Sequence, residues 1–161
     1  MTMGQSMKNV RRSFLKFAGG FCTLATVGAA GLLRSAAARA AGWNKAGFES
    51  KAFTEVMKAL GATGAVDSKD IVITAPDIAE NGAVVPVEVT SRIPGTQSIS
   101  IVAEKNPFPL AATVDLANGG EPYTYVRIKM GQTSDVWAVV QADGRYFTAK
   151  KEIKITVGGC G

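Results

Sequence analysis

The sequence from 70 to 157 consists of short runs in which apolar and polar residues alternate, separated by glycine, proline, asparagine and aspartate. A period of two places every second side chain on the same face of a β-strand, so the pattern predicts strands with one face in a core. In the clearest run, Thr124, Val126, Ile128 and Met130 alternate with Tyr123, Tyr125, Arg127 and Lys129. About seven or eight such strands predict a mainly β fold, an immunoglobulin-like antiparallel β-sandwich; a small barrel is the alternative.

The other strands are expected to bury residues in the same alternating way. Their predicted inward residues are Ile71 and Ile73; Val85, Val87 and Val89; Ile99, Ile101 and Ala103; Ala112, Val114 and Leu116; Val136, Ala138, Val140 and Ala142; and, in the final strand, Ile153, Ile155 and Val157. Pro86 lacks an amide proton, so its strand is predicted to be at an edge or bulged. Asp143-Gly144 predicts a tight type I′ hairpin turn before a strand that begins at Arg145.

One helix is predicted before the strands, from Lys45 to Leu60. Asn44 is a suitable N-cap and Gly61 a suitable stop. An apolar stripe at helical spacing is expected to pack on the domain: Ala52, Phe53, Val56, Met57 and Leu60. Residues 41–157 are therefore expected to form one β-sandwich domain with one N-terminal helix.

Residues 1–40 are predicted to be a removed export signal. A basic start with Arg11 and Arg12 precedes an apolar, glycine-containing run. The segment ends in Ala38-Arg39-Ala40, which has the small-residue pattern of a signal-peptide cleavage site. The paired arginines resemble a twin-arginine signal, which places the mature protein in the periplasm, although Val10 replaces the usual serine or threonine. The alternative, a membrane-anchoring helix, is disfavoured because the run is short and only moderately apolar.

Removal of this leader changes the charge of the chain. The whole sequence has 18 basic and 13 acidic residues, for a net charge of +5. Six basic residues and no acidic ones precede residue 41, so the mature chain has 12 basic and 13 acidic residues, for a net charge of −1. The basic character therefore gives no support for nucleic-acid binding.

The residue inventory argues against an enzyme. The chain has no histidine, which removes the commonest general base and metal ligand, and only Cys160 remains of its two cysteines once the leader is gone. Neither a Ser-His-Asp nor a Cys-His site is possible within the chain. We expect neither a metal nor a cofactor, because zinc and copper sites need more cysteine or imidazole ligands.

The sequence Gly158-Gly159-Cys160-Gly161 is the segment that points to chemistry. The glycines give the thiol a slender, flexible tether that can reach on the order of 13 Å from the sheet. A thiolate is a strong nucleophile that forms S–S bonds, but such an arm offers it neither a base nor an oxyanion hole. The residues alone leave two readings open: a carrier whose cargo is covalently bound to Cys160, and a binding module whose cysteine only forms an intersubunit disulfide.

The chain resembles the SoxY family, the sulfur-carrying subunits of the bacterial thiosulfate-oxidising system. The matching segments are 78–87 (IAENGAVVPV), 103–107 (AEKNP), Asp143-Gly144 and the tail 158–161, besides the twin-arginine leader. The family usually has two glycines after the cysteine, whereas this chain has one, which shortens the arm slightly.

The resemblance implies a sulfur substrate on Cys160 and a set of partners. Family members form heterodimers with a second β-sandwich subunit, SoxZ, in the periplasm. Thiosulfate is conjugated oxidatively to the cysteine at a c-type haem protein (SoxAX-like), and a SoxB-like hydrolase then releases sulfate. In some organisms a SoxCD-like molybdenum–haem dehydrogenase oxidises the remaining sulfur. The haem and metals belong to these partners.

Four further segments have open roles. Trp43 and Trp137 are expected to pack in or beside the core rather than to act in function. The segment 106–109 (NPFP) is predicted to be either a partner contact or a turn between strands. Tyr123 and Tyr125, on the outward side of their strand, are candidates for the subunit interface.

Overall fold

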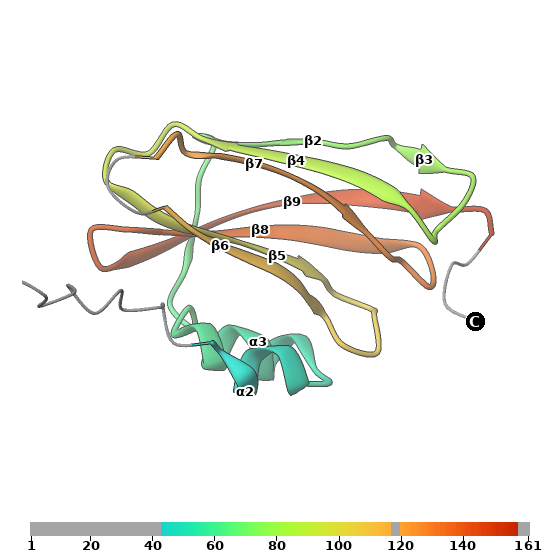
Figure 1. The fold of residues 1–161 in the computed structure, drawn as a ribbon, viewed down its shortest axis with the longest axis horizontal. Coiled ribbons are helices and arrows are strands. Elements are labelled where there is room, and N and C mark those ends of the chain that lie inside the picture. Colours follow the sequence, from blue (N-terminus) through green and yellow to red (C-terminus); the bar gives the residue numbers. More distant parts are fainter. Residues whose placement is uncertain (1–42, 117–119, 158–161) are drawn as a thin grey trace, which may run out of the picture. The chain divides into compact units, whose positions relative to one another are not determined.

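Nine strands and two short helices make up the part of the chain that the computed structural model describes, residues 43–116 and 120–157 (Figure 1). The predicted leader, with Arg11 and Arg12, lies outside the described residues, as does the predicted arm 158–161. Neither described helix is long and apolar enough to cross a membrane.

The strands form two sheets. The larger contains, in spatial order, β1 (Val66–Asp67), β9 (Arg145–Ile155), β8 (Ser134–Ala142), β5 (Thr96–Ala103) and β6 (Leu110–Asp115), and β3 (Ile78–Ala79) also pairs with β9. The smaller contains β2 (Ile71–Thr74), β4 (Val85–Ser91) and β7 (Tyr123–Ile128). All pairs are antiparallel except those of β1 and β3 with β9. The predicted mainly β sandwich is confirmed.

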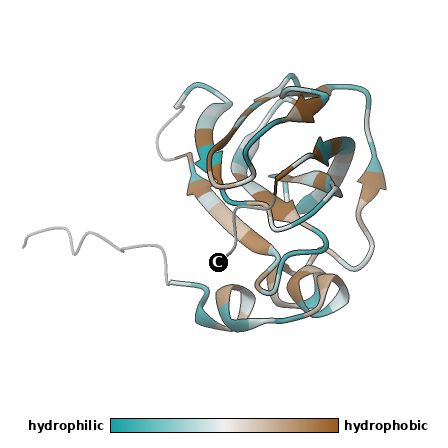
Figure 2. Ribbon diagram, turned by 90° about the vertical axis from the view of Figure 1, so that its right-hand side faces the viewer, coloured by the Kyte–Doolittle hydropathy of each residue, from teal (hydrophilic) through white to brown (hydrophobic). Residues whose placement is uncertain are grey.

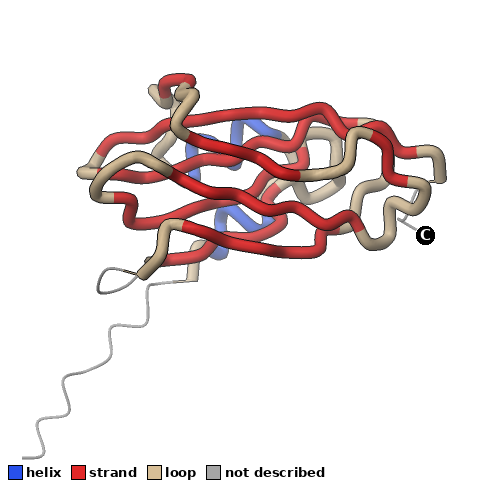
Figure 3. The backbone as a smooth tube through the Cα atoms, turned by 90° about the horizontal axis from the view of Figure 1, so that it is seen from above, coloured by secondary structure: helices blue, strands red, loops and turns tan. Residues whose placement is uncertain are grey.

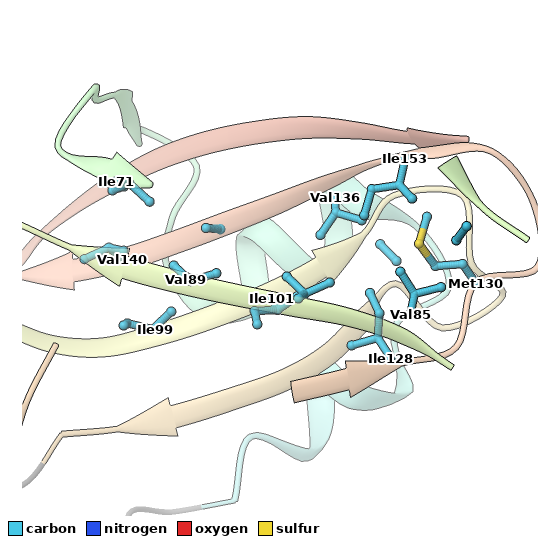
Figure 4. Packing of buried hydrophobic residues seen from close by; sticks show 14 residues of the cluster. Ile71, Val85, Val89, Ile99, Ile101, Ile128, Met130, Val136, Val140 and Ile153 are labelled. Atoms are coloured by element: carbon cyan, nitrogen blue, oxygen red, sulfur yellow. The ribbon is translucent and has the colours of Figure 1, made fainter. Parts of the chain in front are cut away.

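The core lies between the two sheets and is built from the residues that the alternation indicates (Figure 4). Its fully buried members include Val85, Val87, Val89, Ile99, Ile101, Met130, Val136, Ala138, Val140 and Ile153. Complete burial of one such aliphatic side chain stabilises the fold by roughly 1.5–3 kcal/mol relative to exposure. The hydrophobic effect thus fixes the register of both sheets, since a slip of one residue would turn these side chains to solvent.

The predicted helix is present as two: α2 (Lys45–Glu49) and α3 (Phe53–Leu60). Asn44 caps α2, accepting a hydrogen bond from the amide of Gly47 at 2.9 Å, and Gly61 ends α3 with φ = 78°. Ser50 and Ala52 between them have extended backbones, so Ala52 is the N-cap of α3 and is exposed instead of lying in the apolar stripe.

Both helices lie against the outer face of the larger sheet, as a third layer (Figure 2; Figure 3). Their apolar side chains pack on those of β5, β6 and β8; the cluster contains Phe48, Phe53, Val56, Met57, Leu60, Val102, Leu110 and Val139. Gly47 allows the close approach, because a Cβ there would be 2.9 Å from Leu110 Cδ2. Strand β5 is therefore buried on both faces, whereas the outer face of the smaller sheet is not covered by a described helix.

Two expectations about the strands are wrong. Strand β4, which contains Pro86, is the centre of the smaller sheet. Proline is tolerated because β2 ends at Thr74, opposite Glu88, so only β7 flanks β4 at Pro86. Val157 is 63% exposed instead of inward, because β9 is one continuous strand that ends at Ile155.

The Asp143-Gly144 turn between β8 and β9 is confirmed, with φ of 48° and 73° at its two residues. We predict that Gly144→Ala lowers the free energy of unfolding by roughly 1–2 kcal/mol, the cost of a left-handed conformation for a residue with a Cβ. A Cβ at Gly144 would meet no atom within 4 Å, so the penalty comes from the backbone alone.

Gly64→Ala is the matched control. It also has open space around its Cβ position, but its φ is not positive. Urea denaturation should show a lower free energy of unfolding for Gly144→Ala and no decrease for Gly64→Ala. Equal free energies of unfolding for the two variants would show that the left-handed conformation at Gly144 carries no penalty.

Candidate functional site at the end of strand β9

The predicted attachment residue Cys160, with Gly158, Gly159 and Gly161, lies outside the described residues. The structure describes the chain up to Val157, which immediately precedes them. The site can therefore be built from residues 154–157, here called the arm base, and from the loops that hold them. Together these form one end of the sandwich, here called the arm end (Figure 1).

Segment 77–82 runs beside the arm base as far as the last described residue. In the parallel pairing of β3 with β9, Ile78 is opposite Lys154 and Ala79 is opposite Ile155. The amide of Lys154 donates to Asp77 O at 2.9 Å, and the amide of Thr156 donates to Ala79 O at 3.2 Å. This pairing continues the sheet by two residues on the outer edge of β9.

Two further hydrogen bonds restrain the chain beyond the end of β9. Thr156 Oγ1 donates to Glu80 O at 3.0 Å. The buried amide of Gly82 donates to Val157 O at 2.8 Å. Hydrogen bonds thus restrain the backbone up to Val157, the residue that precedes Gly158.

The loop between β7 and β8 holds the other edge of the arm base. Thr133 Oγ1 accepts a hydrogen bond from the amide of Ile155 at 3.0 Å. On the first edge, Lys151 fixes the start of segment 77–82, because its Nζ lies 2.9 Å from Asp77 Oδ1 and donates to Ala75 O at 2.6 Å. Polar contacts on both edges therefore restrain the last residues of β9.

Asn106 connects the loop between β5 and β6 to this arrangement. Its Nδ2 donates to Lys129 O at 2.6 Å, and its Oδ1 accepts from the amide of Gly131 at 3.2 Å. The residue between them, Met130, is fully buried, and its amide donates to Gly82 O at 2.7 Å. A continuous series of hydrogen bonds thus runs from Asn106 through Met130 and Gly82 to Val157.

The structure therefore brings together segments that are distant in sequence. Segments 78–87 and 103–107, which carry the resemblance to a known family, both contribute to the arm end. Of residues 106–109, Asn106 makes a structural contact, and Phe108 is 52% exposed. The sequence analysis identified no role for Gly82, Thr133 or Lys151; Asn81-Gly82, a turn dipeptide, is the one signal that could have indicated this loop.

Exposed aliphatic side chains surround the arm base. Ile78, Val84 and Val157 are each more than half exposed, although all three follow or adjoin strands of the core. An apolar surface next to Val157, three residues before Cys160, is suited to contact with another protein.

The two tryptophans lie on the helix-covered side of the larger sheet. Trp137 packs against Phe53, donates from Nε1 to Glu104 Oε2 at 2.8 Å, and lies under Lys150 Nζ at 5.0 Å. The ion pair with Asp135 raises the pKa of Lys150. Trp43 stacks on Phe48 with ring centroids 4.3 Å apart but is 70% exposed. Packing therefore accounts for Trp137, whereas Trp43 lies largely outside the core.

Two hollows of about 300 and 390 Å³ lie beside the helices, and a third, of about 380 Å³, is lined by Asn106, Phe108, Arg127 and Lys129 among others and adjoins the arm end. Among the residues that the structure describes, no three His, Cys, Asp and Glu side chains are placed to hold a metal ion. The described part of the arm end offers hydrogen-bonded backbone and exposed aliphatic groups, which can position a tether and contact a protein.

Comparisons with known proteins agree with this geometry. The family model described as "Sulfur oxidation protein SoxY" matches residues 56–160. A solved structure of the sulfur carrier protein SoxY from Chlorobium limicola f. thiosulfatophilum is 38% identical, with a TM-score of 0.58 over 64% of this chain and 94% of that one.

A second solved structure, the superoxide reductase (neelaredoxin) from Ignicoccus hospitalis, is 21% identical, with a TM-score of 0.47 over 53% of this chain and 79% of that one. That similarity is too distant to carry an argument. The comparison with curated proteins gives no match. The family model covers most of the chain, including β2 to β9 and the segments of the arm end, so this chain belongs to the SoxY family of sulfur oxidation proteins.

Proposed function

We propose that this protein is a periplasmic sulfur carrier that binds thiosulfate-derived sulfur covalently on Cys160 and presents it to other enzymes of the Sox system. The observation that carries the proposal is the arm end. The backbone is hydrogen-bonded on one edge up to Val157 and on the other edge up to Ile155, and the only thiol of the mature chain follows three residues after Val157. A fixed base with a short glycine tether lets the thiol enter a narrow active site while the body stays outside.

Three residues extend at most about 10 Å, so any enzyme that acts on the thiol must approach the arm end closely. The exposed Ile78, Val84 and Val157 provide apolar contact area at that position. The short reach explains why the same surface would be used by every enzyme that handles the cargo.

The loading step forms one S–S bond. The thiol of Cys160 and thiosulfate (S₂O₃²⁻) give Cys–S–S–SO₃⁻, one proton and two electrons, and the electrons pass to a c-type haem partner of SoxAX type. Hydrolysis by a SoxB-like partner then converts Cys–S–S–SO₃⁻ and water into the persulfide Cys–S–SH, sulfate and one proton. In organisms that contain it, a SoxCD-like dehydrogenase oxidises the remaining sulfur.

The carrier itself catalyses none of these steps. In this proposal it supplies only a nucleophilic thiol. We further propose that it acts as a heterodimer with a SoxZ-like β-sandwich subunit, and that the leader with Arg11 and Arg12 directs it to the periplasm by the twin-arginine pathway.

We predict that Cys160→Ser abolishes thiosulfate-dependent turnover by the reconstituted partner enzymes, because a hydroxyl cannot form the S–S bond. Its melting temperature should equal that of the wild type, since the last residue held by the described fold is Val157. Intact-protein mass spectrometry of the loaded wild type should show one added S₂O₃ unit, or one added sulfur, on Cys160, both removable by a mild reductant.

The alternative function, a binding module whose cysteine only joins two subunits, gives a different result. Its Cys160 would carry a single homogeneous disulfide partner and no sulfur adduct. Turnover supported by Cys160→Ser protein would also exclude the carrier role.

We also predict that Asn106→Ala weakens the arm base. Loss of its two hydrogen bonds should lower the free energy of unfolding by about 1–3 kcal/mol and speed hydrogen exchange at the amides of Met130 and Gly82. The matched control is Gln132→Ala in the same region, which removes one long exposed hydrogen bond, 3.3 Å to Lys105 O. Similar exchange rates in both variants would show that Asn106 does not support the arm base.

A further inference from the structure

The smaller of the two hollows beside the helices, of about 300 Å³, is lined by both helices and by four strands of the larger sheet. It lies near the hairpin that joins β8 to β9, because Gln141 and Tyr146 in its lining are paired just before and after the Asp143-Gly144 turn. This hairpin is at the opposite end of β8 and β9 from the arm end (Figure 1). The hollow is therefore separate from the site of the proposed function.

Strand register aligns polar side chains across the floor of this hollow. In one row, Ser98 of β5 lies between Asp115 of β6 and Gln141 of β8. Tyr146 of β9 is opposite Gln141 and ends the row. Neighbouring strands lie about 4.8 Å apart, so the register brings four side chains that can form hydrogen bonds next to one another.

A second row borders the apolar cluster beneath the helices. Ser100 lies between Thr113 and Val139, and Val139 belongs to that cluster. Ser100 is 3% exposed, and its Oγ lies 3.0 Å from Thr113 Oγ1, so the buried hydroxyl is paired. The polar residues of the two rows are here called the polar floor: Ser98, Ser100, Thr113, Asp115, Gln141 and Tyr146.

The polar floor differs from the rest of the same sheet face. Toward the arm end, that face carries the charged side chains of Asp135, Lys150 and Glu152, as expected of a surface that only meets water. Beneath the helices it carries Val102 and Val139, as expected of a surface that only supports packing. Between these regions, short hydroxyl side chains leave a volume open, and that is the composition of a ligand pocket.

The hydrogen bonding within the floor leaves groups available for a ligand. Ser98 Oγ donates to Gln141 Oε1 at 3.4 Å, which is longer than the roughly 2.5–3.0 Å usual for a hydroxyl donor. That contact does not involve the amide nitrogen of Gln141. Asp115 has no ion pair with a described residue, so its carboxylate can accept hydrogen bonds from a ligand.

An aromatic wall borders the polar floor. Trp43 stacks on Phe48 with the ring planes 5° apart, so one face of the indole is covered while most of the side chain remains exposed. Asn44 holds this wall in place, because its Nδ2 donates to Ala59 O at 3.0 Å and joins the start of α2 to the end of α3. The hollow thus has a flat aromatic surface that is ordered before a ligand binds.

The charges around the hollow disfavour an anionic ligand. Among the described residues that line it, Asp115 is the only charged one, and there is no lysine or arginine. Thiosulfate or sulfate would therefore meet a carboxylate and no cation, which repels a dianion. The ligand must be neutral or cationic.

The hydrogen-bonding groups favour a neutral ligand that is rich in hydroxyls. Hydroxyl and amide side chains both donate and accept, and a carboxylate accepts, which matches the neighbouring hydroxyls of a sugar ring. The negative face of an indole attracts the C–H groups on one side of such a ring. An organic cation is bound best by several aromatic faces around it, whereas Trp43 and Phe48 stack on each other. The volume is at the lower end of the roughly 300–1,000 Å³ of ligand pockets, which suits one ring.

We propose that this hollow binds one neutral sugar ring, stacked on Trp43 and hydrogen-bonded to the polar floor. Asp115 accepts hydrogen bonds from the sugar hydroxyls, and the amide nitrogen of Gln141 donates to them. The site lies away from the arm end and needs no thiol, so it adds a binding function that does not depend on the carrier role.

The test is an NMR titration of the ¹⁵N-labelled protein with glucose, galactose and N-acetylglucosamine. At least one of these sugars should shift the amide signals of the polar floor and the indole Nε1 signal of Trp43 in a saturable way. A ligand of this size is expected to bind with a dissociation constant on the order of 1 mM.

Two substitutions test the assigned contacts. Trp43→Ala removes the aromatic surface and Gln141→Leu removes the amide, and each should weaken binding about tenfold. Phe108→Ala is the matched control, since it removes another exposed aromatic ring at the arm end and should bind the sugar like the wild type. Circular dichroism melts of all variants establish that they are folded.

The proposal would be overturned if none of the three sugars gave saturable shifts, or if both folded variants bound like the wild type. Floor signals that move with tetramethylammonium chloride and with no sugar would assign the hollow to an organic cation, and signals that move only with thiosulfate would assign it to an anion; either result contradicts the proposal. Cys160→Ser protein should bind the sugar normally, so a failure of the carrier role leaves this test unaffected.

Discussion

Strand β9 is held on both edges by polar contacts and on one face by the core, and the rest of the arrangement depends on this. It pairs with β8 over nine residues and with β1 and β3 on the other edge, while Ile153 is fully buried between the sheets. Hydrophobic burial fixes its register, and the hydrogen bonds from segment 77–82 extend that order to Val157. The described fold thus positions the chain up to Val157, the residue before Gly158.

The surfaces of the sandwich differ in what covers them. The helices cover one face of the larger sheet and use its apolar side chains for stability. The outer face of the smaller sheet is not covered by a described helix, and the arm end carries the exposed Ile78, Val84 and Val157. In the proposed function the arm end must stay accessible, because every enzyme that handles the cargo has to approach it.

Much of the fold could be predicted because it follows from periodicity and turn chemistry. The alternation in 123–130 gives the correct inward residues, and Asp143-Gly144 has the positive φ values that its type indicates. The division of the helix was not predictable, because the apolar spacing continues across the break at Ser50–Ala52. Pro86 led to the wrong prediction of an edge strand. Whether a proline fits within a strand depends on where the neighbouring strand ends, here β2 at Thr74, and the sequence around Pro86 does not show this. The arm base was missed for a related reason: Gly82, Ala79 and Val157 interact through backbone groups, which every residue type carries.

The contacts that hold the arm base have a consequence for the timing of activity. Thr156 bonds to Glu80 across 76 positions of the chain, and the carbonyl of Val157 is held by Gly82. Contacts between such distant residues form only when the intervening strands have assembled. An incompletely folded molecule therefore contains Cys160 but lacks the hydrogen-bonded arm base. An enzyme that must bind both the thiol and the arm end would act only on the folded protein.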